Sequence, residues 1–104
     1  MSKIKLQSEY EDLDKYLNLS ESIFYYKKDT HDLHNPYGAA YIGTDGYKAY
    51  CINGKYHRLD GPAIIWQNGN ENYYINGKNL SKEEFETHPE RLKFLGKEYL
   101  ICLK

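Results

Sequence analysis

The string from His57 to Asp60, His-Arg-Leu-Asp, is the part of the chain that most resembles a catalytic or ligand-binding cluster. An imidazole can act as a general base or metal ligand near neutral pH, and a guanidinium can hold a phosphate through paired hydrogen bonds. His34 stands in register one repeat earlier. His34, His57 and Arg58 therefore form a candidate anion-binding set, and a phosphodiesterase that uses the two histidines is a third possibility after the two binding functions below.

The same residues also suit a structural role. Asp60 precedes Gly61-Pro62, which is ordinary turn chemistry, and His57 and Arg58 could tie neighbouring hairpins together by hydrogen bonds. Because the string belongs to a repeated unit, and catalytic groups are seldom repeated with a scaffold, we favour this structural interpretation.

A second polar group lies in the segment KKDTHDLH, which contains His31 and His34. The His-x-x-His spacing can bind a metal, but a good site needs three or four ligands in a fixed geometry, so a flexible polar loop is favoured. The chain has no glycine-rich phosphate loop, no nucleophile–base signature and no Cys/His framework. Cys51 and Cys102 stand among apolar residues, as small buried hydrophobes do. We expect no metal, no cofactor and no enzymatic activity.

Tyrosine is the unusual component, with 12 residues against 3 Phe and 1 Trp. Tyrosine suits half-buried pleated surfaces and is enriched where proteins recognise partners. Basic residues interleaved with these rings could line an edge that binds single-stranded nucleic acid or a nucleotide by stacking. The same basic residues could instead protect edge strands from aggregation. They are Lys27, Lys28, Lys55, Arg58 and Lys78.

The composition describes a globular chain without strong charge. The 104 residues are 40% hydrophobic and 28% charged, with a net charge of -1. This size allows one domain over residues 1–104, and the charge gives no general attraction to nucleic acid or anionic membrane. No apolar run reaches the roughly 20 residues that span a bilayer, and the amino terminus lacks the apolar core of a signal peptide. We expect a cytoplasmic protein without a membrane partner.

An internal repeat of 23 residues organises the chain. Residues 38–60 align with residues 61–83 without a gap, and nine positions are identical. Chance would give only one or two identities, so the repeat is real. The identical pairs are Gly38/Gly61, Ala40/Ala63, Ile42/Ile65, Gly46/Gly69, Tyr50/Tyr73, Ile52/Ile75, Asn53/Asn76, Gly54/Gly77 and Lys55/Lys78.

Each unit contains two turn signals between strand-like runs. Asp45-Gly46 and Asn68-Gly69 favour type I′ hairpin turns, and Asn53-Gly54 and Asn76-Gly77 supply the second turn of each unit. Residues 22–37 resemble a degenerate first unit, with a strand at Ile23–Tyr26 and then an irregular loop. The pattern predicts a meander of short antiparallel strands at Ala40–Gly43, Lys48–Ile52, Ala63–Gln67 and Asn72–Ile75.

Period-two alternation divides these strands into two faces. The positions shared by both units predict a common packed face of Ala40, Ile42, Tyr50, Ile52 and their equivalents Ala63, Ile65, Tyr73 and Ile75. The other face is also apolar, which requires a cover from the flanking segments or from a partner. It contains Tyr41, Cys51, Ile64, Trp66 and Tyr74.

The flanking segments predict helices. Ser8 and Glu11 form a capping box for a helix over about residues 9–18, and Ser81 and Glu84 form another before a helix that Pro89 should stop. Residues 92–103 around Gly96-Lys97 predict a final hairpin. The expected fold is mainly β (α+β): an N-terminal helical segment (1–21), an antiparallel β-hairpin meander (22–80), and a C-terminal helix with a final hairpin (81–104).

Tyr-x-Ile-Asn-Gly-Lys, then Gly-x-Ala, then Asp/Asn-Gly resembles the MORN repeat, a β-hairpin unit of the same length. The run from Asn53 to Ala63 more closely resembles the NGKxHRxDGPA units of phage and large DNA virus proteins, whose last unit often continues as in Asn76–Phe85 here. The similarity covers about residues 38–86. It implies a MORN-like fold and a viral origin, and it implies no general biochemical activity.

These observations predict a non-enzymatic protein-interaction module, such as a phage accessory or counter-defence protein that binds and blocks a host protein in the host cytoplasm. The alternative is a nucleotide or nucleic-acid binding protein that sequesters a small anionic ligand. An open meander also makes a homo-oligomer plausible. Partner contacts are expected where the repeats disagree or rings are exposed, at Tyr41, Tyr47, Tyr56, Trp66 and Tyr74.

Overall fold

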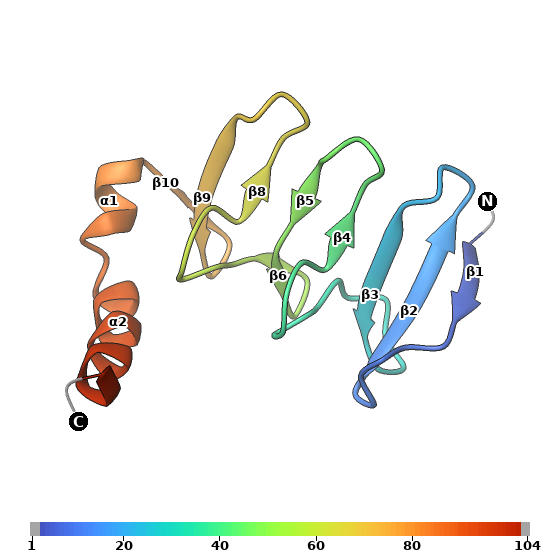
Figure 1. The fold of residues 1–104 in the computed structure, drawn as a ribbon, viewed down its shortest axis with the longest axis horizontal. Coiled ribbons are helices and arrows are strands. Elements are labelled where there is room, and N and C mark those ends of the chain that lie inside the picture. The colour runs from blue at the N-terminus through green and yellow to red at the C-terminus, as the bar shows by residue number, and fades with distance from the viewer. Residues whose placement is uncertain (1–2, 103–104) are drawn as a thin grey trace.

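The computed structural model describes residues 3–102, and side-chain environments as far as residue 96. The fold is mainly β, as predicted, with an eight-stranded antiparallel sheet in the order β1-β2-β3-β4-β5-β8-β9-β10 and a small second sheet of β6 and β7 (Figure 1). The two helices follow the last strand. The strands are β1 (Lys3–Leu6), β2 (Leu13–Asn18), β3 (Ile23–Lys27), β4 (Tyr41–Ile42), β5 (Lys48–Ala49), β6 (Cys51–Ile52), β7 (Lys55–Tyr56), β8 (Ile64–Ile65), β9 (Glu71–Ile75) and β10 (Lys78–Leu80), and the helices are α1 (Lys82–Glu86) and α2 (Pro89–Cys102).

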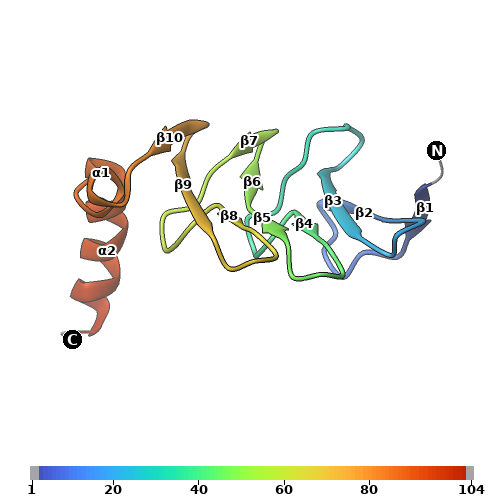
Figure 2. The same cartoon turned by 90° about the horizontal axis from the view of Figure 1, so that it is seen from above.

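Each repeat unit builds a hairpin in the main sheet and then a second hairpin. In residues 38–60 these are β4–β5 and β6–β7, and in residues 61–83 they are β8–β9 and β9–β10. Seen from above, β7 and β10 lie on one side of the main row of strands, together with the loop that follows β3 (Figure 2). The meander is therefore a row of hairpins with a partial second layer on one face.

The second turn of each unit has the predicted geometry. Asn53 and Gly54 have φ values of 50° and 80°, and Asn76 and Gly77 have 52° and 82°. Positive φ at both central residues defines the type I′ turn, whose twist matches that of the flanking strands. The asparagine–glycine pair is the sequence that adopts it with little strain.

The first turn of each unit differs from the prediction. At Asp45-Gly46 and Asn68-Gly69 only the glycines have positive φ, at 101° and 90°, so neither is a type I′ turn. The Asp45 carboxylate accepts a hydrogen bond from the backbone N–H of Tyr47, and the Asn68 side chain does the same for residue 70. These side-chain bonds hold the first residue of each pair outside the left-handed region.

The buried core takes residues from both predicted faces. Ala40, Ala49 and Cys51 form one cluster, while Ile42 and Ile65 stay half-buried on the opposite side of the sheet. The single-phase prediction failed because β4, β5 and β6 are each only two residues long and residues 40 and 50 lie outside them, so a strict alternation does not extend from Ala40 to Ile52. The other residues packed on this cluster are Leu33, Tyr41 and Tyr47.

The predicted helix over residues 9–18 is wrong. Residues 3–6 and 13–18 form β1 and β2, which pair with each other, and β2 pairs in turn with β3. Ser8 accepts a hydrogen bond from the N–H of Tyr10, two residues on, and so forms a local turn instead of a helix cap. Pairing with β3 outweighed a local helical pattern.

At the other end, the capping box at Ser81 and Glu84 is confirmed, and α1 follows it. Phe85 on α1 is 2% exposed and packs against the second core cluster. The predicted final hairpin is wrong within the described residues: α1 ends at Glu86, before Pro89, and Pro89 is the first residue of α2, which runs through Gly96 to Cys102. Proline is well tolerated at the first position of a helix. The rest of the second cluster is Ile75, Leu80, Leu59 and Tyr73.

Candidate functional site

The five residues predicted to contact a partner lie in two groups of neighbouring aromatic rings. Tyr47 is central: its ring centroid lies 5.3 Å from Tyr41 and 5.2 Å from Trp66, both edge to face. Tyr56 and Tyr74 form a second pair, 5.0 Å apart. Burial, followed by the neighbouring Tyr56, raises the pKa of Tyr47 to about 12. We call these five residues the aromatic patch.

Strand register explains why these rings converge. Tyr41 on β4 is paired with Phe24 on β3 and with Ala49 on β5, and Ala49 is paired with Ile64 on β8. Directly paired residues share a face of the sheet, and so do residues two apart on a strand. Trp66, two residues beyond Ile64, therefore follows the same face and reaches Tyr47.

The row of rings continues beyond the predicted set into β3 and β2. Phe24 lies 4.5 Å from Tyr41 and 6.2 Å from Tyr26, and Tyr16 lies 5.4 Å from Tyr26, measured between ring centroids. Sequence reasoning missed these residues because Tyr16 was assigned to a helix. The alternation of Phe24 and Tyr26 within the predicted strand at 23–26 was the signal that could have found them.

Exposure is concentrated at one end of this row. Trp66 is 43% exposed and Tyr56 is 37% exposed, whereas Phe24 and Tyr26 are buried. In the second repeat unit, Asn72 and Tyr74 replace Ala49 and Cys51, which are core residues of the first unit. The side chain of Asn72 accepts a hydrogen bond of 2.5 Å from the Trp66 indole N–H. The second unit thus exchanges part of its apolar core for half-buried aromatic and amide groups.

The two histidines of the repeat bind the scaffold in the same way. The backbone N–H of Asn53 donates to Nδ1 of His34 at 2.9 Å, and the N–H of Asn76 donates to Nδ1 of His57 at 2.9 Å. The neighbouring backbone bonds repeat as well, from Gly54 to Leu33, and from Gly77 to Tyr56, each at 2.8 Å. Each imidazole therefore joins its own unit to the turn of the next one.

Arg58 is held by the scaffold, too. Its Nε donates to the Asp60 carboxylate at 3.0 Å, one terminal nitrogen donates to the carbonyl of Pro62 at 3.1 Å, and its Cζ lies 3.9 Å from the ring centroid of Tyr50. A Cβ at Gly61 would come within 3.1 Å of this Cζ, which favours glycine at this position. The Arg58 guanidinium is thus neutralised by Asp60 and stacked on the ring of Tyr50.

Asn35 makes the corresponding hydrogen bond to the backbone one unit earlier. Its side-chain nitrogen donates to the carbonyl of Ala39 at 2.9 Å, and its oxygen accepts from the N–H of Tyr37. Residues 35 and 39 correspond to Arg58 and Pro62 at the 23-residue offset. A neutral amide can therefore replace the guanidinium, which favours a structural role for Arg58.

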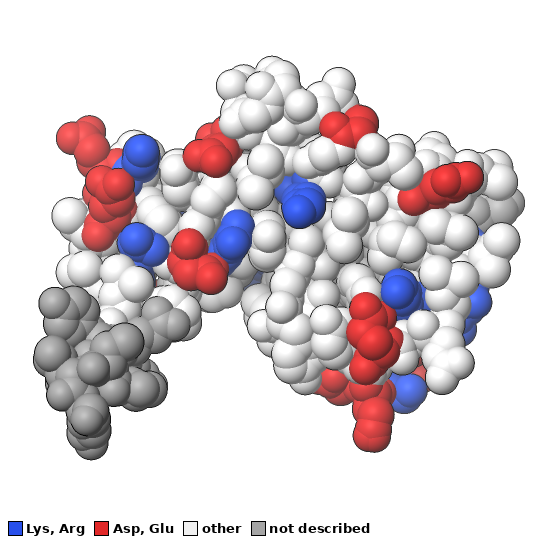
Figure 3. All heavy atoms as spheres, in the orientation of Figure 1, with Lys and Arg blue, Asp and Glu red and all other residues white. Residues whose placement is uncertain are grey.

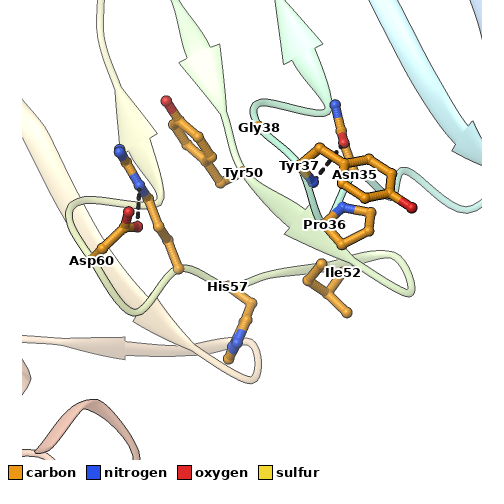
Figure 4. A pocket seen from close by; sticks show the side chains of 9 residues that line it. Asn35, Pro36, Tyr37, Gly38, Tyr50, Ile52, His57 and Asp60 are labelled. Carbon is orange, nitrogen blue, oxygen red and sulfur yellow. Dashed lines mark hydrogen bonds and ion pairs between the residues drawn. The ribbon is translucent and has the colours of Figure 1, made fainter. Parts of the chain in front are cut away.

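A pocket of about 310 Å³ separates Asn35 from Arg58. His57 and Arg58 line it, but His34 does not, so only two members of the anion-binding set are brought together. In Figure 4, Asn35, Pro36 and Tyr37 lie across the pocket from Asp60. An anion in this pocket would have to compete with the Asp60 carboxylate for Arg58.

Burial lowers the pKa of both repeat histidines. For His34, nearby Lys27 adds to this effect, while Asp12 and Asp32 oppose it. For His57, burial again favours the neutral imidazole, and Glu90 opposes it. The neutral form is also the one that the scaffold needs, because a protonated Nδ1 cannot accept the turn N–H.

We expect stability to fall as the pH falls below the usual histidine pKa near 6.5. A group whose pKa is lower in the folded state binds more protons when unfolded, so its contribution is present above its unfolded pKa and is lost below it. Urea unfolding between about pH 7.5 and about pH 5.5 measures this loss. Carboxylates whose pKa is lowered in the folded protein, such as Glu9 and Asp14, change the stability only at lower pH.

The control for this prediction is the double variant His34→Gln, His57→Gln, which removes both titrating groups. Its free energy of unfolding should change much less over the same pH range. An equal pH dependence in the double variant and the natural chain would show that other groups are responsible.

Other candidate chemistry is weaker. Among the side chains described, those of residues 3–96, no three His, Cys, Asp or Glu gather closely enough to hold a metal ion. Cys51 is 2% exposed, and burial raises the pKa of its thiol to about 11, as for an unreactive core residue. The side chain of Cys102 lies outside the described part.

Surface charge offers no further site on the face shown in Figure 3, where acidic and basic residues are interspersed. No helix within residues 3–102 is both long and apolar enough to span a bilayer. In comparisons with known proteins, no family model, curated protein or solved structure matches this chain.

Proposed function

We propose that this chain is a non-enzymatic module that binds another protein through the aromatic patch. The observation that supports this proposal is the clustering of the patch rings in two groups, Tyr41–Tyr47–Trp66 and Tyr56–Tyr74, each with one exposed ring, Trp66 and Tyr56 respectively. Aromatic side chains bury large areas with few rotatable bonds, so they are the commonest energetic centres of protein interfaces.

The geometry of the patch suits a preformed binding surface. The Trp66 indole is held by its hydrogen bond to Asn72 and by its contact with Tyr47, so little side-chain freedom is lost on binding. The half-buried rings around it provide a rigid support. A rigid aromatic anchor with polar neighbours is typical of the centre of an interface.

The proposed partner is a host protein. The resemblance of the repeat to units in phage and large DNA virus proteins supports this choice, and it also supports a MORN-like repeat and a counter-defence or inhibitory role in the host cytoplasm. Blocking needs no catalytic group, in keeping with imidazoles and a guanidinium that are held by the scaffold.

Trp66→Ala is expected to weaken partner binding by at least roughly 30-fold, the loss typical of a residue at the centre of an interface. The immobilised natural chain and the variant are exposed to the same host lysate, and proteins retained only by the natural chain are identified. The affinity of each purified candidate is then measured by calorimetry. Trp66→Phe should bind with intermediate affinity, because it keeps a ring but loses the indole N–H.

Leu92→Ala is the matched control, because Leu92 is 51% exposed on α2, away from the patch. It should retain the partner fully. If no protein binds saturably, or if Trp66→Ala binds as tightly as Leu92→Ala, the aromatic patch is not the binding surface. Solution mass, measured in parallel, distinguishes a host partner from a second copy of this chain.

A further inference from the structure

A second cavity lies at the opposite end of the sheet from Trp66. It has a volume of about 450 Å³ and is lined by Lys3 on β1, Tyr16 on β2, Tyr26 on β3, and Thr30 and His31 in the loop that follows β3. This volume falls in the range of pockets that bind small molecules. No acidic residue is among these lining residues.

Lys3 is the most informative residue of this cavity. The ion pairs of the described residues join Lys5 to Asp14, Lys15 to Glu9, and Arg58 to Asp60, and none includes Lys3. The Lys3 ammonium instead lies 4.4 Å from the Phe24 ring centroid and 5.0 Å from that of Tyr26, and it donates to the Tyr26 hydroxyl. An ammonium held by rings and one hydroxyl keeps donors free for an anion.

The cavity walls are aromatic. The rings of Tyr16 and Tyr26 meet edge to face with centroids 5.4 Å apart, and Tyr26 is 8% exposed, which holds it firmly. His31 is exposed, with its ring centroid 6.2 Å from that of Tyr26. The Thr30 hydroxyl already donates to the carbonyl of Lys27, so it is a spacer. The cavity therefore combines ring surfaces, one imidazole and one cation that pairs with no carboxylate of the described side chains.

We propose that this cavity binds a small aromatic anion of the nucleoside monophosphate class. The base lies against Tyr16 and Tyr26, and the phosphate accepts hydrogen bonds from the Lys3 ammonium and the His31 imidazole. Stacking on aromatic side chains does not depend on the identity of the base, and an ammonium is a common phosphate ligand. A cationic ligand would be repelled by Lys3.

This site differs from the anion-binding set predicted from the sequence. There, Arg58 is paired with Asp60 and both repeat histidines accept backbone hydrogen bonds. At the new site, the cation has no carboxylate partner among the described residues. The proposal does not depend on the aromatic patch, since the cavity involves β1–β3 and the exposed end of the patch involves β7 and β8.

Calorimetry on the full chain at constant ionic strength tests the proposal with adenosine monophosphate as the probe. We expect saturable binding that is at least about tenfold tighter than that of adenosine or inorganic phosphate alone, because ring and phosphate contribute together. Lys3→Gln should weaken binding about tenfold or more, Tyr16→Leu should weaken it through loss of the ring, and Lys3→Arg should keep it.

Lys48→Gln is the matched control. Lys48 is exposed and, being paired with Ile42 next to Tyr41, lies on the opposite face of the sheet. It should bind adenosine monophosphate like the natural chain. Circular dichroism of each variant verifies folding, and Lys3→Arg keeps the test valid if Lys3→Gln does not fold. Absence of saturable binding to the natural chain, or equal binding by folded Lys3→Gln, would overturn the proposal.

Discussion

Replacing Phe85 with alanine is expected to lower the free energy of unfolding by about 3–5 kcal/mol, the usual cost of removing a buried phenyl ring. Phe85 is 2% exposed, and its ring lies 4.7 Å from that of Tyr73. The Arg91 guanidinium lies 4.5 Å from the centre of the same ring, and its Nη1 donates to the carbonyl of Leu59. The phenyl group therefore joins α1, α2 and the last repeat unit.

Urea unfolding measures this effect, with Leu92→Ala as the control. Leu92 is 51% exposed, so its removal should change the free energy of unfolding by no more than about 0.5 kcal/mol. Phe85→Leu keeps most of the buried volume and should fall between the two. If Phe85→Ala unfolds at nearly the same urea concentration as Leu92→Ala, the Phe85 side chain does not stabilise the packing of α1 on the last repeat unit.

Arg58→Ala is expected to lower the free energy of unfolding by roughly 2–4 kcal/mol, from a charged hydrogen bond and a cation–π contact. The hydrogen bond to the Pro62 carbonyl and the stacking on Tyr50 are lost together. A residue kept only to bind a ligand would have little effect on stability in the ligand-free protein. Denaturation of the ligand-free chain therefore separates the structural role from a binding role.

Asp60→Ala provides the comparison. The Asp60 side chain is 61% exposed, and exposed ion pairs contribute at most about 1 kcal/mol. Asp60→Ala should therefore lower the free energy of unfolding much less than Arg58→Ala does. Arg58→Lys should be intermediate, since lysine keeps the charge but loses the planar fork. A neutral result for Arg58→Ala would contradict the structural role and return Arg58 to the list of binding residues.

The repeat was the most predictable part of the fold, because its turns are local. Asn53-Gly54 and Asn76-Gly77 specify a type I′ turn from two residues, and both turns have the expected backbone. Asp45-Gly46 and Asn68-Gly69 carry a similar signal, yet their side chains bond the backbone two residues on. The competition between these two outcomes depends on the flanking strands and is not contained in the dipeptide.

The two ends were less predictable because their structure depends on distant residues or on competing local signals. At the N-terminal end, Tyr16 and Leu17 fit a helical pattern, but β2 is paired along its length with β3. At the C-terminal end, Gly96 was interpreted as a turn, although one glycine does not interrupt a helix rich in good helix formers.

The candidate site was partly predictable. The five residues of the aromatic patch were identified from the sequence by type and by differences between repeats, and the structure places them in two groups of neighbouring rings. What the sequence could not supply was strand register, which joins Phe24 to Tyr41 and extends the row of rings to Tyr16. Register is a property of paired strands that lie far apart in the sequence.

The 23-residue offset of the hydrogen bonds has a consequence for how such a chain can change its length. His34 binds the turn at Asn53 as His57 binds the turn at Asn76, so removal of residues 38–60 would present Asn76 to His34 in the same position. Duplication of the same segment would add another hairpin with every boundary bond satisfied. Gene copies that lose or gain one whole unit would therefore still encode a foldable protein, while insertions of other lengths would disrupt the boundary. Recombination between repeats could thus lengthen or shorten the row of hairpins in discrete steps.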